Sequence, residues 1–227
     1  MLATKRRSNR LSDLRNREKG KRIFILANGP SINDLDLRVL RDEVVIGMNA
    51  STLLEERFDF VSEYYVVSDK RFLLSEEKRM WATNKLHLDT LRVVRKDLAP
   101  YDDGSLINNT YYVFPLARDG FSRDLRHGFY YGCTTTMLAL QLAYHLGARE
   151  IYLLGCDLRY PEESPRFYAE SKPQLEDAFA SVQLSNILNA AIDFEKTGGI
   201  VKNCSERSFL RAYLPFQNFP ELFGKCG

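Results

Sequence analysis

The sequence is poor in the residues that build metal sites. Its 227 residues include only three histidines and four cysteines, and the cysteines (Cys133, Cys156, Cys204 and Cys226) form no CxxC pair. Structural zinc sites usually need closely spaced ligands, so we expect neither a metal site nor a metal cofactor. Cys133 and Cys156 lie in apolar runs and are typical of buried free thiols, which favours a reducing, cytoplasmic compartment.

Long apolar runs are also missing. The chain has no stretch of about 18 apolar residues, the length that spans a bilayer, and its first 20 residues lack the apolar segment of a secretory signal. Internal repeats are absent as well. The composition, with 44% hydrophobic and 27% charged residues, is that of an ordinary globular protein. The sequence therefore favours one globular domain without a membrane span.

The positive charge is concentrated at the start of the chain. Residues 1–22 carry nine lysines or arginines against Asp13 and Glu18, a net charge of +7 within a total of only +2. We interpret residues 1–20 as a basic N-terminal arm or helix, followed by one domain over residues 21–227. Such a segment is solvated by default, and it could also hold the protein peripherally at the anionic inner face of a membrane. Because no recognition motif accompanies it, nucleic acid is not an expected partner.

Apolar, β-branched runs alternate with helical patterns along the chain. The sequence predicts strands at 22–27, 44–48, 63–67, 151–155 and 200–202, with weaker ones at 86–94 and 111–114. It predicts a short helix or turn at 33–42 and helices at 70–82, 133–147 and 173–196, the last with Leu175, Phe179 and Val182 on its apolar face. Loops are expected at 100–105 and 158–172. This alternation is typical of an α/β fold: one Rossmann-like domain with a mainly parallel sheet and helices on both faces.

The first predicted strand ends in Asn28-Gly29-Pro30-Ser31. Gly29 lacks a Cβ, so a ligand could approach the backbone there, and Pro30 fixes the turn. Ser31 can cap a following helix, whose free N–H groups attract phosphate. The segment is neither a GxGxxG nor a GxxxxGK[ST] motif. Alone it is equally compatible with a plain turn between a strand and a helix.

Other predicted strands also end in small or polar residues. The second strand is followed by Asn49, the third by Ser68 and Asp69, and the strand at 151–155 by Cys156 and Asp157. The carboxyl ends of parallel strands meet at one edge of a sheet, where open α/β folds bind their ligands. Convergence of these side chains predicts a ligand site at that edge.

Two further segments carry hydroxyl groups toward the same edge. Thr134 and Thr135 open the helix predicted at 133–147, where they would either bind a ligand or cap the helix. Tyr160 and Tyr168 lie in the loop after Asp157. Tyrosine hydroxyls can hold a phosphate without adding charge, although loop tyrosines can equally pack on the surface.

The chain resembles bacterial sialyltransferases of glycosyltransferase family 42. The resemblance combines the NGPS loop, Asn49, the small residues that open the helix predicted at 133–147, and the run GAREIYLLGCDLRY. The chain is also similar to a wider group of domains that includes archaeal 6-hydroxymethylpterin diphosphokinase-like proteins and flagellin-modifying transferases. The resemblance extends over about residues 21–215 and depends on the combination of motifs, since NGPS alone would not carry it.

The resemblance implies a metal-independent transferase that takes a CMP-activated sugar, such as sialic acid or a related nonulosonic acid. Its acceptor would be a surface glycan or glycolipid, as in polysaccharide biosynthesis. The implied donor-site residues are Asn28, Gly29, Pro30, Ser31, Asn49, Ser68, Asp69, Thr134, Thr135, Tyr160 and Tyr168.

The sequence departs from the sialyltransferase pattern at the catalytic base. The family uses a histidine in the loop beyond the two tyrosines, but no histidine follows His145 here. Three candidates remain: His127, Asp157 at the end of a strand, and Glu170 beside Tyr168. We favour Asp157, because a strand end holds its geometry better than a loop does.

Two other functions stay open. A pyrophosphokinase-like enzyme would use ATP with magnesium and would need clustered carboxylates, for which Asp69 and Asp157 are the obvious pair. A non-catalytic module would bind the nucleotide without transferring anything.

Overall fold

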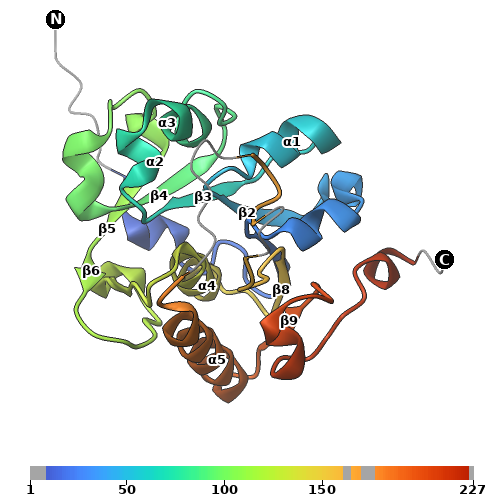
Figure 1. Cartoon of the computed structure of the whole chain (residues 1–227). Helices are drawn as coiled ribbons and strands as arrows, with labels where there is room; N and C mark the ends of the chain where they lie inside the picture. Colours follow the sequence, from blue (N-terminus) through green and yellow to red (C-terminus); the bar gives the residue numbers. More distant parts are fainter. Residues whose placement is uncertain (1–8, 161–164, 170–176, 225–227) are drawn as a thin grey trace, which may run out of the picture.

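The computed structural model describes residues 9–160, 165–169 and 177–224. These residues build a seven-stranded sheet in the order β5-β4-β3-β2-β1-β8-β9 (Figure 1). Every neighbouring pair in it is parallel. The strands are β1 (Arg22–Leu26), β2 (Val44–Met48), β3 (Tyr64–Val67), β4 (Leu91–Arg95), β5 (Thr110–Val113), β8 (Glu150–Leu154) and β9 (Ile200–Asn203). The predicted parallel α/β fold is confirmed.

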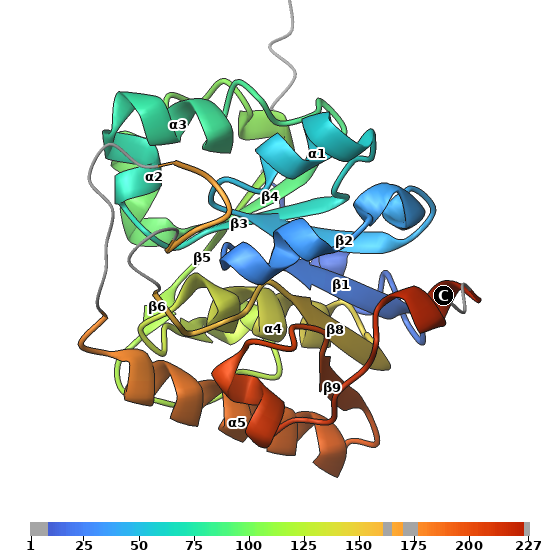
Figure 2. The same ribbon diagram turned by 45° about the vertical axis from the view of Figure 1, so that its right-hand side comes forward.

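Helices cover both faces of the sheet, as Figure 2 shows. One face carries α1 (Thr52–Phe58), α2 (Arg71–Leu74) and α3 (Glu76–Ala82), and the other carries α4 (Thr135–His145) and α5 (Ala180–Lys196). A small second sheet pairs β6 (Pro115–Leu116) with β7 (Phe129–Tyr130). Short 3-10 helices complete the described part: Leu11–Leu14, Pro30–Asp34, Leu37–Leu40, Lys96–Tyr101, Ile107–Asn109, Leu125–His127, Phe209–Ala212 and Pro220–Phe223.

The central strands are apolar throughout because both of their faces are covered. In β1, Ile23 and Ile25 join the core under α4, while Phe24 and Leu26 join the core on the opposite face. Helix α4 lies between the sheet and α5, and all its residues except Tyr144 are buried. Most of its buried residues are apolar, as expected for a helix covered on all sides.

The order in which the chain adds strands to the sheet changes direction at β1, and this change determines the position of the candidate site. The chain leaves β1 for β2 on one side, and later returns through α4 to β8 on the other side. Connections that diverge from neighbouring strands leave a crevice beyond the carboxyl ends of those strands. In this chain the crevice lies beyond β1 and β8.

Several element boundaries differ from the sequence predictions. The helix expected at 70–82 is two helices, because Ser75 has an extended backbone (ψ 127°). Phe179, expected on the apolar face of the last helix, precedes its first turn and is 56% exposed. Buried side chains of that helix include Ile187, Ala190 and Phe194 instead, while Leu175 lies outside the described residues. Helix α1 was not anticipated, and the segment expected as a short helix or turn at 33–42 consists of 3-10 turns.

The described part of the N-terminal segment packs onto the domain. Leu14 is fully buried in the core shared with α4, and the Asn9 amide donates to the carbonyl of Asn108 at 2.6 Å. The Tyr64 hydroxyl donates to Glu18 at 2.7 Å. From residue 9 onward, the segment predicted as a basic arm is therefore part of the fold.

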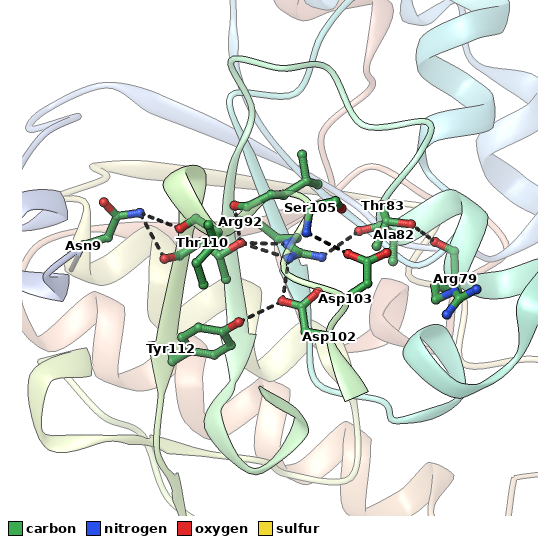
Figure 3. Close-up of polar contacts among 12 residues, drawn as sticks. Asn9, Arg79, Ala82, Thr83, Arg92, Asp102, Asp103, Ser105, Thr110 and Tyr112 are labelled. Carbon is green, nitrogen blue, oxygen red and sulfur yellow. Dashed lines mark hydrogen bonds and ion pairs between the residues drawn. The ribbon is translucent and has the colours of Figure 1, made fainter. Parts of the chain in front are cut away.

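A buried ion pair lies behind the β4–β5 edge of the sheet (Figure 3). Arg92 and Asp102 contact each other at 2.6 Å, with side chains 0% and 1% exposed. Thr110 accepts from the Arg92 guanidinium, and the Tyr112 hydroxyl donates to Asp102 at 2.8 Å. Burying two charges is costly unless such additional hydrogen bonds satisfy them. The bonds from Arg92 and Tyr112 reach Oδ2 of Asp102, while its Oδ1 is buried without a hydrogen-bond partner in the described residues.

Candidate functional site

A cavity occupies the crevice beyond β1 and β8. Its volume is about 100 Å³, and its wall combines loops that are far apart in the sequence. Of the residues singled out from the sequence, it brings together Asn28, Gly29, Asn49, Thr134, Thr135, Asp157 and Tyr160. The volume is below the roughly 300–1,000 Å³ of typical ligand pockets, so a nucleotide that enters must extend beyond its mouth.

The NGPS loop is held by Asp157. The carboxylate of Asp157 accepts hydrogen bonds from the backbone N–H of Ser31 at 2.9 Å and from the Ser31 hydroxyl. Asp157 is 3% exposed. Ser31 therefore does not cap the following helix, which is a short 3-10 helix rather than an α-helix.

The glycine of the loop has a structural explanation. A Cβ on Gly29 would collide with the Asp157 carboxylate and would lie 2.6 Å from the carbonyl oxygen of Gly155. The space that Gly29 leaves open is thus taken by the loop after β8 and not by a ligand. Pro30 follows at the first helical position, where its fixed φ fits.

Two asparagines offer their side chains to the cavity. The Asn28 side-chain oxygen accepts from the Ala50 backbone N–H at 3.2 Å, while its amide nitrogen donates to no residue in the described part of the chain. Asn49 has φ of 55°, a left-handed conformation that asparagine tolerates better than most residues. Both side chains remain able to bind a ribose hydroxyl or a base edge.

The start of α4 forms another wall of the cavity. Thr134 is the N-cap residue, and its hydroxyl accepts from the Thr136 backbone N–H at 3.3 Å. The Thr135 hydroxyl accepts from Ser68 at 2.9 Å. Ser68 is fully buried beneath this helix start and does not line the cavity, so it supports Thr135 from behind.

Three other predicted residues lie elsewhere. Asp69 pairs with Arg71 at 2.6 Å, and Tyr168 packs edge-on against Trp81 with ring centroids 5.0 Å apart. Neither lines the cavity, nor does His127, which is exposed at the end of a short 3-10 helix. Glu170 lies outside the described residues.

Sequence reasoning missed the partners of Tyr160. Its hydroxyl donates to Asp177 at 3.2 Å, and the Gln183 side chain donates to the same carboxylate at 2.7 Å. The Arg166 guanidinium lies 4.6 Å from the centre of the Tyr160 ring. Burial raises the pKa of Tyr160, so its hydroxyl stays protonated and can donate. In the sequence, the only indication of this hydrogen-bonded group is that Asp177 and Gln183 lie on either side of the start of α5.

A second cavity adjoins the first. It has a volume of about 680 Å³ and shares Asp157, Leu158, Arg159 and Tyr160 with the first cavity as a common wall. Asp177 and Phe209 line its other sides. The volume falls in the range of small-molecule sites.

Metal ligands do not gather at either cavity. In residues 9–160, 165–169 and 177–224, no group of three or more His, Cys, Asp or Glu side chains is placed to hold a metal ion. Cys133, Cys156 and Cys204 are free thiols, and burial raises the pKa of Cys156 to about 12. The wall of the first cavity therefore offers hydrogen-bond donors, amides and one engaged carboxylate.

None of the helices in the described ranges has the length and apolar character that crossing a bilayer requires.

Two solved structures with the same architecture are glycosyltransferases. The sialyltransferase CstII from Campylobacter jejuni, solved with the substrate analogue cytidine-5'-monophosphate, superposes with a TM-score of 0.55 at 15% identity, over 88% of each chain. The MAf glycosyltransferase from Magnetospirillum magneticum AMB-1 gives a TM-score of 0.53 at 15% identity, over 94% of this chain but 39% of that one. The present chain thus spans about two fifths of the MAf protein. At 15% identity, these superpositions show that the proteins share a fold.

Comparison with curated proteins finds no match. A family model described as 6-hydroxymethylpterin diphosphokinase MptE-like matches residues 2–163. This match includes the NGPS loop, β2, α4 and β8, and it covers well over half of the chain, which confirms the resemblance drawn from the sequence. The chain therefore belongs to the 6-hydroxymethylpterin diphosphokinase MptE-like family.

Proposed function

We propose that this protein is a glycosyltransferase that takes its sugar from a CMP-activated donor, such as CMP-sialic acid or a related nonulosonic acid. The observation that carries the proposal is the cavity at the switch point. Asn28 and Gly29 of the NGPS loop, Asn49, the start of α4 and Tyr160 line it, while Pro30 and Ser31 line the second cavity. The fold is shared with a sialyltransferase that was solved with cytidine-5'-monophosphate. The acceptor would be a glycan or glycolipid, and the basic start of the chain would favour one at an anionic membrane surface.

Each part of the cavity has a role in this proposal. Asn28 and Asn49 would bind the nucleoside through their amides. The hydroxyls and first N–H groups of α4, at Thr134 and Thr135, would face the phosphate, which a helix N-terminus favours. Tyr160 would donate a hydrogen bond to the phosphate as CMP departs, and such a donor stabilises the charge that develops on the leaving group.

Asp157 was our sequence-based candidate for the base. Because both of its oxygens accept from Ser31, we propose that its main role is to hold the donor loop. Use of Asp157 as the base stays a prediction, and so does use of His127 or Glu170.

The family description supports a second candidate, a pyrophosphokinase-like enzyme that uses ATP and magnesium. Its metal would need carboxylates at the site. In the described part of the chain, Asp157 is bound to Ser31 and Asp69 to Arg71. This placement favours the glycosyltransferase.

A thermal-shift panel distinguishes the candidates. CMP, CDP, UDP, GDP and ATP would each be tested with and without magnesium, because a ligand that binds the folded state raises the melting temperature. We expect CMP to stabilise the protein equally with and without metal. If only ATP together with magnesium stabilises the protein, the kinase is favoured. CMP binding with neither transfer nor hydrolysis of CMP-sugars would indicate a binding module.

A further inference from the structure

The second cavity has an exposed aromatic ring and two arginines, of which one is paired with a carboxylate of the described residues and the other is not. Phe209, 47% exposed, lies under the Arg159 guanidinium, which is 4.5 Å from the centre of the ring. Arg159 has no carboxylate partner in the described part of the chain, whereas Arg207 on the same cavity pairs with Asp34. A ligand with an apolar ring face and a negative group would satisfy both Phe209 and Arg159.

Asp177 lies at the boundary between the two cavities. It lines the second cavity, while the two side chains that hold it, Tyr160 and Gln183, line the first. The Phe179 backbone N–H donates to the other Asp177 oxygen at 2.9 Å. Three hydrogen bonds thus orient the carboxylate, and about one of its four acceptor positions remains for a ligand hydroxyl.

Resting on the proposed function, we infer that the second cavity binds the acceptor, that the acceptor is an acidic sugar, and that Asp177 is the base that accepts the proton of its hydroxyl. Asp177 would thus serve as the catalytic base in place of the histidine that sialyltransferases use, which has no counterpart in this sequence.

In the proposed transfer step, the acceptor hydroxyl, the donor sugar and Asp177 account for every bond and proton. The acceptor oxygen forms a bond to the anomeric carbon of the donor sugar as its proton moves to an Asp177 oxygen. The bond from the anomeric carbon to the phosphate oxygen breaks, and CMP leaves with that electron pair. The hydrogen bond from Tyr160 to Asp177 is long at 3.2 Å, against about 2.7–2.8 Å for the usual O–H···O contact. Rotation of the Tyr160 hydroxyl toward the departing phosphate would leave Asp177 free to take the proton.

Hydrolysis of CMP-N-acetylneuraminic acid tests the base without a known acceptor, because water can occupy the position of the acceptor hydroxyl. Asp177→Asn keeps the shape of the side chain but not its basicity. We expect it to lower CMP release by about 10²–10⁴-fold and to leave CMP affinity unchanged. Asp193→Asn is the control, since Asp193 lies on α5, the helix that follows Asp177, in surface ion pairs with Arg123 and Lys196.

The acceptor class is tested by competition. Lactobionic acid and lactose share a galactose end, but lactobionic acid carries an open-chain gluconate in place of the glucose ring of lactose. We expect lactobionate to inhibit donor hydrolysis at a tenfold or more lower concentration. Arg159→Ala should abolish this difference. Arg211→Ala should not, because Arg211 makes the matching contact with Phe216, at 4.1 Å, outside the cavity.

The outcomes separate the inference from the proposed function. Failure of the wild type to bind CMP would overturn the proposed function itself. CMP binding by the wild type without any hydrolysis or transfer would overturn it as well, in favour of a binding module. Full hydrolysis by Asp177→Asn, beside an active wild type, would overturn the assignment of Asp177 alone. Weaker CMP binding by Arg159→Ala, with the preference for lactobionate retained, would assign the second cavity to the donor.

Discussion

Asp157 binds Ser31 through both the backbone N–H and the side-chain hydroxyl of the serine, across 126 residues of sequence. The pair joins the loop after β1 to the loop after β8, directly at the switch point of the sheet. A buried carboxylate with two such donors fixes the loop whose Asn28 and Gly29 line the first cavity.

The first prediction concerns this contact. Asp157→Asn keeps the shape of the side chain but places an amide group opposite one of the two Ser31 donors. We expect it to lower the free energy of unfolding by about 1–3 kcal/mol, because a buried donor loses its acceptor, and to weaken CMP binding with it. Chemical denaturation and CMP titration measure both effects.

Ser31→Ala is the matched control for Asp157→Asn, since it removes the hydroxyl donor and keeps the backbone donor. A smaller loss in both measurements is expected. Intact stability and CMP affinity together with lost turnover in Asp157→Asn would contradict the loop role and identify Asp157 as the base.

The second prediction concerns the nucleotide contacts. Asn28→Ala should weaken CMP binding by about 1–3 kcal/mol, if a buried ligand group loses its partner. Asn49 is best replaced by glycine, because glycine accepts the φ of 55° while an alanine there would be strained. Isothermal titration of both variants, with folding checked by circular dichroism, is the measurement. CMP affinities equal to that of the wild type in both variants would refute the contacts.

Much of the fold follows from local sequence. Strands such as β2 and β8 are buried on both faces, so their continuous apolar runs could be recognised without knowing their neighbours. The end of each run also placed Asn28, Asn49 and Asp157 at one sheet edge, because parallel strands share a direction. Helix α4 was recognised from local signals too: threonines that can cap it, a helix-forming run and Gly147 as its stop.

What the sequence did not show depends on contacts between distant residues. Gly29 is required by Asp157, which is far away in the chain. Tyr168 looked like a phosphate ligand, but Trp81 gives it an apolar neighbour. Asp177 fell inside the helix predicted at 173–196, and only the fold places it before the helix and beside Tyr160. Phe179 was assigned to an apolar face by its spacing alone, and it lies before the helix begins.

The third prediction concerns pH. Glu55 on α1 is 8% exposed, and burial raises its pKa from 4.5 to about 7, although hydrogen bonds from Ser62 act in the opposite direction. Below pH 4.5 the side chain is protonated in both states; as the pH rises, the unfolded chain loses this proton first. The free energy of unfolding should therefore fall by up to about 3 kcal/mol as the pH rises from 4.5 to about 7.

Glu55→Gln isolates this contribution, because glutamine can still accept from Ser62 and does not titrate. We expect the variant and the wild type to be similarly stable near pH 4.5, and the variant to be more stable at pH 8. Urea unfolding at both values measures the difference. A constant difference between the two proteins across this range would show that Glu55 titrates normally.

The last prediction concerns the buried pair of Arg92 and Asp102. Arg92→Met leaves an unpaired carboxylate in a site where the partner side chains are 0% and 1% exposed, so we expect a loss of about 3–5 kcal/mol in the free energy of unfolding. The double variant Arg92→Met with Asp102→Leu removes both charges and should recover most of that loss, although Tyr112 then loses the acceptor of its hydroxyl. CMP affinity should be unchanged in both, since neither residue lines a cavity at the switch point.

The surface pair of Arg41 and Asp59 provides the comparison for this test. Its side chains are 61% and 90% exposed, and solvent screens such pairs so well that Arg41→Met should cost less than about 1 kcal/mol. Denaturant unfolding of the three variants beside the wild type then separates the cost of an unpaired buried charge from the loss of an ion pair as such. Equal losses in Arg92→Met and Arg41→Met would mean that Asp102 reaches solvent or a proton when its partner is removed, and that the network at the β4–β5 edge does not depend on the pair.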